Sequence, residues 1–197
     1  MATSLYLITN SKLTGNETQS DWNRIVNELQ QLNMDTTSYF EKGRLVKETG
    51  DWNYKIEEEG NNLFNVDFEG PFHIQPKLLS NIGVIYTIYK YRLLYEIYGF
   101  DWFNSFRKDL YNIVKIIGGT EVIYLADNCC DKLESYLVTA EEYNVPYEDI
   151  KQKMIEEFGQ PITDYSKLNF DKLDYSKIDE FFCDNFSDLK VTNEYEK

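Results

Sequence analysis

The sequence predicts an α+β fold with a mostly antiparallel sheet of about five to six strands, helices packed on one face, and an amphipathic helix at the C-terminal end. Residues 37–68 alternate apolar and polar side chains with the period of two that is typical of strands. Residues 101–117 and 131–158 instead follow the helical period. Runs of one period followed by runs of the other favour the α+β class.

The first two elements are predicted to be a strand and a helix. SLYLIT at 4–9 is a short apolar run between polar residues, which indicates a buried strand. DWNRIVNELQQL at 21–32 carries apolar side chains at helical spacing, and Ser20 or Asp21 is suited to the N-cap. The apolar stripe consists of Trp22, Ile25, Val26, Leu29 and Leu32.

Residues 38–68 predict two hairpins. WNYKIEE at 52–58 and FNVDF at 64–68 alternate, and the residues EEGNN between them supply turn chemistry. SYFEKGRLVKE at 38–48 has the same character and predicts a preceding hairpin. Four antiparallel strands are therefore expected in this part of the chain.

Residues 82–98 form the most apolar stretch, and at 100° per residue they project two apolar sides. Val84 and Ile88 lie on one side, and Ile82 and Tyr86 lie on the other. A helix with two apolar sides must be covered twice, so we expect it between the sheet and the next helix.

The following segment predicts three helices and one strand. Residues 101–117 carry an apolar stripe, with Asp101 as the expected N-cap and Gly118 as the end signal. TEVIYLADN predicts a central strand at 121–126. Helices are expected at 131–143 and at 146–158, the second beginning at Pro146 and ending before Gly159.

DYSKLNFDKLDYSKIDEFF at 164–182 holds three near-copies of one pentad. A solenoid needs several coils of such units, so three units favour turns laid against a domain. The last copy merges into helical spacing and predicts a helix at 176–189. We expect one α+β domain over 1–160, with 161–197 as a turn segment and helix packed on it.

Charge is unevenly distributed along the chain. The formal net charge is −14, and residues 121–197 hold 19 acids against 8 bases, whereas residues 1–120 hold 15 against 12. Such a surface repels phosphate backbones and anionic lipid, which disfavours direct binding to nucleic acid or membranes. It permits a basic protein partner.

The residue inventory argues against several chemistries. With three cysteines and one histidine there is no zinc set, and neither a signal peptide nor a spanning segment is indicated, so a cytoplasmic protein is expected. Cys129 and Cys130 precede a helix, but neighbouring acids disfavour a reactive thiolate. His73 has apolar neighbours and is expected to make a structural hydrogen bond. We therefore expect no catalytic residue, metal or cofactor.

The leading hypothesis is a non-enzymatic acidic binding protein, of the immunity-protein or antitoxin type, that covers a basic site on a partner such as a toxin or nuclease. The acids and amide around the end of the 121–126 strand and along the next helix are the candidate partner-binding residues. They are Asp127, Asn128, Asp131, Glu134, Glu141 and Glu142.

Two alternatives remain open. Carboxylates near the end of the 121–126 strand could serve a small hydrolase that depends on a divalent metal. Exposed tyrosines could instead form the contact of a homo-oligomer.

Overall fold

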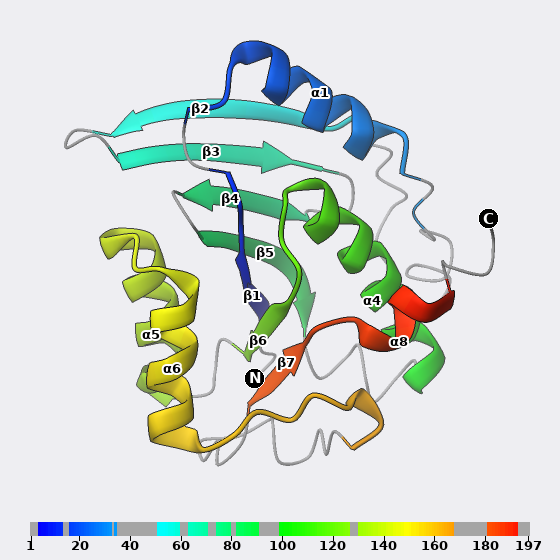
Figure 1. Cartoon of the computed structure of the whole chain (residues 1–197), viewed down its shortest axis with the longest axis vertical. Coiled ribbons are helices and arrows are strands. Elements are labelled where there is room, and N and C mark those ends of the chain that lie inside the picture. The colour runs from blue at the N-terminus through cyan, green and yellow to red at the C-terminus, as the bar shows by residue number, and fades with distance from the viewer. Residues whose placement is uncertain are drawn as a thin grey trace.

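The computed structural model describes residues 4–13, 16–32, 34, 51–59, 63–70, 74–79, 82–90, 99–126, 130–167 and 181–192. Within these ranges seven antiparallel strands form one sheet in the order β2-β3-β4-β5-β1-β6-β7 (Figure 1). They are β1 Ser4–Asn10, β2 Asn53–Glu59, β3 Leu63–Glu69, β4 Gln75–Leu79, β5 Ile82–Lys90, β6 Val122–Ala126 and β7 Phe182–Asp184. The helices are α1 Gln19–Gln30, α4 Gly99–Ile116, α5 Cys130–Tyr143, α6 Tyr147–Phe158 and α8 Ser187–Thr192. The predicted α+β class and antiparallel sheet are confirmed.

Strand β1 lies in the interior of the sheet, as its apolar run predicts. It pairs antiparallel with β5 on one side and with β6 on the other, although the three strands are far apart in sequence. Leu5, Leu7 and Ile8 are fully buried, so consecutive side chains of this strand are covered on both faces. Strand β6 is also interior, but only the short edge strand β7 lies beyond it.

Strands β2 and β3 form the hairpin predicted from residues 52–68, with Tyr54 opposite Phe68 and Ile56 opposite Val66. Val66 and Phe68 are buried, whereas Asp67 between them is not, which is the alternation expected of a strand covered on one face. The preceding hairpin predicted at 38–48 lies outside the described residues.

The predicted helix over residues 82–98 is wrong for its first half, because Ile82–Lys90 is strand β5. Ile82, Val84 and Ile85 are all buried, which means that both faces of this strand are covered. A short strand buried on both faces is apolar throughout, and periodicity alone does not distinguish it from a buried helix. The preceding segment Gln75–Leu79, for which no strand was predicted, forms β4 and pairs with β5. Residues 91–98 lie outside the described part.

Helix α4 carries the predicted apolar stripe but begins earlier than predicted. It starts at Gly99, so Asp101 lies inside the helix instead of capping it. After the helix, Gly118 has φ +81°, and the next amide, that of Gly119, donates to the carbonyl of Val114 at 2.8 Å, as in a glycine-terminated helix. The buried stripe consists of Phe103, Phe106, Leu110, Ile113, Val114 and Ile117.

The helices cover both faces of the sheet, whereas the sequence predicted one. Paired residues of an antiparallel sheet point to the same side, so the row Leu7, Tyr124 and Phe182 defines one face, and the adjacent row Ile8, Ile123 and Cys183 defines the other. Phe103 of α4 packs on Tyr124, and Trp22 of α1 packs on Phe68, which lies on the same face. We call this the α4 face. Tyr147 of α6 contacts Cys183 and Glu141 of α5 contacts Tyr86, so the opposite side is the α5 face.

The C-terminal segment adds the last strand to the sheet. The helix predicted over 176–189 is wrong for Phe182–Asp184, which pairs with β6 as strand β7, and a helix begins at Ser187 as α8 Ser187–Thr192. Ile162 forms a parallel bridge to Phe182 on the outer side of β7. The first pentad makes a turn, with a 3₁₀ helix at Tyr165–Lys167, and residues 168–180 lie outside the described part.

Helix α1 begins with a capping box at Thr18, two to three residues earlier than predicted. The Thr18 hydroxyl accepts from the Asp21 amide, and the Asp21 carboxylate accepts from the Thr18 amide at 2.8 Å. Ser20, predicted as a cap, lies within the helix and is exposed.

Replacing Thr18 should therefore cost more than replacing Ser20. We expect Thr18→Ala to lower the free energy of unfolding by about 1 kcal/mol, because an orphan helix donor loses its acceptor. The matched control Ser20→Ala should change it by less than about 0.5 kcal/mol. Urea unfolding followed by circular dichroism measures both. Equal losses would contradict the assignment of the cap.

Candidate functional site

The predicted partner-binding residues are only partly visible in the structure. Asp127 and Asn128 lie outside the described residues, and for Asp131 and Glu134 only the backbone, in α5, is described. The remaining two, Glu141 and Glu142, lie in the last turn of α5 and face different ways.

Glu142 is exposed, whereas Glu141 is half-buried against the α5 face of the sheet. The Tyr86 hydroxyl of β5 donates a hydrogen bond to the Glu141 carboxylate. The Lys77 ammonium of β4 lies 3.8 Å from the same carboxylate. Glu141 is therefore fixed to the sheet by a donor and a cation, both from the first half of the chain.

A hollow opens beside Glu141, between α5 and the sheet. Its volume is about 300 Å³. The lining residues come from β3, β4, β5 and α5, and one sequence-predicted residue is among them. They are Asp67, Phe68, Glu69, Gln75, Pro76, Lys77, Tyr86 and Glu141. The sequence predicted only Glu141 among them, since β4 and β5 were not recognised as strands and the neighbours of β3 in the sheet were therefore unknown.

The Tyr86 phenol remains protonated in this environment. Burial raises its pKa, and so do the hydrogen bond to Glu141 and the negative charge of that carboxylate. Tyr86 therefore acts as a fixed donor at neutral pH, and the charge of the hollow is set by its carboxylates and Lys77.

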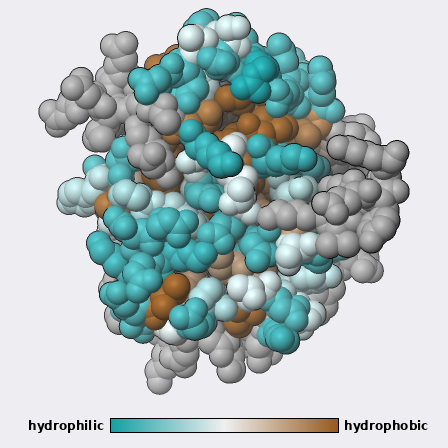
Figure 2. Space-filling model, in the orientation of Figure 1, coloured by the Kyte–Doolittle hydropathy of each residue, from teal (hydrophilic) through white to brown (hydrophobic). Residues whose placement is uncertain are grey.

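Helices α5 and α6 form an acidic layer over the α5 face. Together they contain eight acidic and three basic residues. Glu142, Glu148, Asp149 and Glu156 are exposed, whereas Lys151, one of the bases, is bound to Glu121 at 2.6 Å. The surface over these helices is predominantly hydrophilic in the view of Figure 2.

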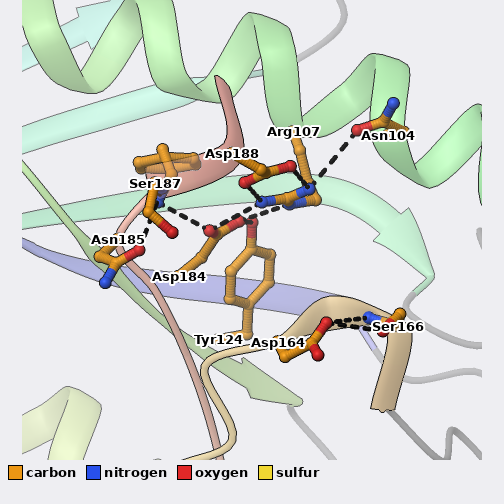
Figure 3. A network of polar contacts seen from close by, with 10 residues as sticks. Asn104, Arg107, Tyr124, Asp164, Ser166, Asp184, Asn185, Ser187 and Asp188 are labelled. Atoms are coloured by element: carbon orange, nitrogen blue, oxygen red, sulfur yellow. Dashed lines mark hydrogen bonds and ion pairs between the residues drawn. The ribbon is translucent and has the colours of Figure 1, made fainter. Parts of the chain in front are cut away.

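Not every acid of the C-terminal part contributes to that surface. Asp184 and Asp188 bind the guanidinium of Arg107 from α4, on the opposite face of the sheet (Figure 3). Together with Glu141, these carboxylates are paired with cations from the first half of the chain. Among the described residues of the C-terminal part, the exposed acids therefore lie mainly on α5 and α6, and the last strand and helix contribute less.

Arg107 is fully buried, and all five of its N–H donors have acceptors. Nε and Nη2 bind the two oxygens of Asp184 at 2.6 and 2.9 Å. Both Nη atoms bind Asp188 at 2.9 and 3.1 Å, and Nη1 also donates to Asn104. The Tyr165 ring lies under the guanidinium at 4.0 Å. This cluster fastens the β7–α8 stretch and the turn at Tyr165 to α4, which is a structural role.

A second buried cluster surrounds Cys183, on the α5 face. Its thiol lies 3.5 Å from the Glu121 carboxylate and 3.7 Å from the Tyr147 hydroxyl. Burial, followed by the charge of Glu121, raises the pKa of Cys183 to about 12. The thiol therefore stays protonated and unreactive at neutral pH.

Cys129 and His73 lie outside the described residues, and only the backbone of Cys130 is described. Among the side chains that the structure describes, no group of three His, Cys, Asp or Glu residues could hold a metal ion. None of the described helices is both long enough and apolar enough to cross a bilayer. No family model, curated protein or solved structure matches the chain.

Removing the Arg107 charge should strongly destabilise the protein. Arg107→Met leaves Asp184 buried beside an apolar side chain, so we expect a loss of about 3–5 kcal/mol in the free energy of unfolding. The control Lys108→Met, on the exposed neighbour, should cost less than about 0.5 kcal/mol. Urea titrations measure both, and equal effects would contradict a buried ionic anchor.

The Asp188 contact should make part of the stability depend on pH. Burial alone would raise the pKa of Asp188, but the hydrogen bonds and charge of Arg107 outweigh it and lower the pKa. The contribution is therefore complete above the ordinary pKa of Asp, about 4, and is lost as pH falls through the lower folded value.

We expect Asp188→Asn to be less stable than the wild type at pH 7, by at most about 1 kcal/mol because the side chain is half exposed. The difference should shrink as the pH falls below the ordinary pKa of Asp, about 4. Urea unfolding of both proteins between pH 7 and pH 2.5 tests this. A difference that does not vary with pH would contradict it.

Proposed function

We propose that this chain is a non-enzymatic binding protein whose acidic α5–α6 layer covers a basic site on a partner protein. The observation that carries the proposal is a set of exposed acids on the described parts of the two helices, where Lys153 is the one exposed base. They are Glu142 at the end of α5 and Glu148, Asp149, Glu156 and Glu157 on α6. Negative potential gathered on one layer speeds association with a cationic surface and orients the two proteins. A toxin or nuclease with a basic active site is the class of partner that this chemistry fits.

The exposed side chains of α5 supply more than charge. Val138 is 40% exposed and Tyr143 is 70% exposed, and both lie close to Glu142 along the helix. Aromatic and aliphatic side chains ringed by charge are typical of the centres of protein interfaces. This surface therefore offers an apolar contact in addition to electrostatic steering.

The hydrolase alternative receives no specific support from the described residues. The described residues of the acidic layer are engaged with protein groups or exposed to solvent: the Glu157 carboxylate accepts from the Tyr136 hydroxyl at 2.7 Å, and Glu156 accepts from Gln152. Such contacts are typical of helix surfaces.

The proposal is tested on the rate of association. A partner is first recovered by affinity purification from the native cell and then purified. We expect the double variant Glu142→Lys/Asp149→Lys to associate about tenfold more slowly than the wild type at low salt, with a flatter dependence on NaCl, because steering is electrostatic. Stopped-flow fluorescence measures the rate.

The matched control is Glu28→Lys/Asp51→Lys, which makes the same change in net charge in the first half of the chain, at the half-buried Glu28 and the exposed Asp51. It should slow association much less. Equal slowing by both variants would show that net charge alone matters. An unchanged rate in the α5–α6 variant would overturn the proposal.

A further inference from the structure

Tyr143 ends helix α5, and its side chain is 70% exposed. It is the most exposed of the large hydrophobic side chains that the structure describes, since the next two are Ile56 at 41% and Val138 at 40%. A tyrosine ring has a large apolar area and a polar tip, so its burial against a partner contributes more free energy than that of a smaller side chain. Tyr143 therefore offers a partner a large aromatic surface.

Tyr143 differs from the other tyrosines whose side chains are described. Each of the others makes a hydrogen bond, a ring contact or a cation–π contact within the chain. They are Tyr6, Tyr54, Tyr86, Tyr111, Tyr124, Tyr136, Tyr147 and Tyr165. Among the described residues, Tyr143 makes none of these contacts. Its ring and hydroxyl are therefore not used to hold the described part of the fold together.

The backbone around Tyr143 is fixed by the turn between α5 and α6. Residues 144–146 form this turn, in which Asn144 takes a left-handed conformation with φ +45°. Pro146 is the N-cap of α6, and its carbonyl accepts two amide hydrogen bonds, at 3.0 and 3.2 Å. Ala140 before the turn and Tyr147 after it are buried. A tyrosine has few side-chain torsions to order, so a ring on a fixed backbone binds at a low cost in entropy.

The charged side chains that flank Tyr143 in the sequence are acidic. Glu142 precedes it, and Glu148 and Asp149 lie in the first turn of α6. All three are exposed, and residues 142–150 contain no lysine or arginine. Negative charge on both sides of an aromatic ring favours a basic partner and disfavours an acidic one, including a second copy of this chain.

An exposed tyrosine flanked by charge has the character of an interface centre. Tyrosine is among the residues that most often dominate binding energy, and such residues are surrounded by contacts that exclude water. Because the Tyr143 side chain projects from the surface, it fits a cleft on the partner. The face of the ring carries negative potential, which attracts lysine and arginine side chains. A basic cleft therefore complements both the ring and the acids beside it.

We propose that Tyr143 is the anchor of the complex: its ring enters the basic site of the partner protein and stacks on a lysine or arginine side chain there. The inference rests on the proposed function, because it requires a partner whose site is basic. It adds a division of roles between the exposed residues. Acids that act at long range set the association rate, whereas a buried contact such as that of Tyr143 sets the dissociation rate.

The test measures dissociation of the full chain from the basic partner protein purified for the experiment above, which is immobilised for surface plasmon resonance. We expect Tyr143→Leu to dissociate about fivefold faster than the wild type or more, because leucine keeps apolar bulk and lacks the ring face. Tyr143→Phe keeps the ring and should dissociate within about twofold of the wild type. The association rates of both variants should stay within about twofold, since neither substitution changes the charge.

The matched control is Ile56→Ala, which truncates another exposed apolar side chain, on β2. It should leave the dissociation rate unchanged. Because Tyr143 makes none of the contacts named above with described residues, Tyr143→Leu should also leave the urea midpoint of unfolding unchanged. Unfolding curves of both variants therefore separate a lost contact with the partner from a damaged fold.

The outcomes are distinct. Equal dissociation rates of the leucine and phenylalanine variants, or equal acceleration by Ile56→Ala, would overturn the anchor. A dimer of the wild type that is lost in Tyr143→Leu would show a second copy of the chain as occupant, which also overturns it. If Tyr143→Leu dissociates like the wild type while charge reversal on α5–α6 still slows association, only this inference fails. If Tyr143→Leu dissociates faster as expected while charge reversal has no effect, the acidic layer is not the steering surface, so the proposed function fails and the Tyr143 contact stands.

Discussion

The structure depends on the burial of β1, β5 and β6 from both sides. Helix α4 covers one face of these strands and helices α5 and α6 cover the other, so Leu7 and Ile8, which are adjacent in sequence, are both fully buried. Burial of a large apolar side chain stabilises the folded state by about 1.5–3 kcal/mol relative to leaving it exposed. Cover on both faces also excludes water from the hydrogen bonds between the strands. The remaining elements are arranged around this doubly covered centre.

The polar features follow from where that cover ends. On the α5 face, Val84 of β5 is buried, whereas Lys77, which is paired with it on β4, is only half-buried. Asp67 of β3, paired with Lys77, is half-buried as well. The transition from apolar to charged residues occurs within two strand spacings, directly beside α5. The hollow beside Glu141 lies at this transition: α5 forms one side of the hollow, and polar residues of the sheet form its floor.

The acids that the structure describes in the C-terminal part include two groups with different surroundings. Asp184 and Asp188 form ion pairs with Arg107, and this pairing attaches β7 and α8 to α4. The exposed acids of α5 and α6 are left to solvent or to a partner. A carboxylate neutralised by a bidentate guanidinium contributes little to long-range steering, whereas exposed carboxylates on one layer add to a common field.

The sequence by itself determined the local elements whose periodicity is unambiguous: the strand at β1, the β2–β3 hairpin, and the buried stripe and glycine end of α4. It also indicated the acidic character of the α5–α6 segment. Only the tertiary structure decided that residues 82–90 form a strand, because two-sided burial removes the alternation by which a strand is recognised. It likewise decided that helices occupy both faces, that Phe182–Asp184 joins the sheet, and that Glu141 meets Lys77 and Tyr86. These are contacts between residues distant in the chain, and local propensity carries no information about which distant partner a side chain will meet.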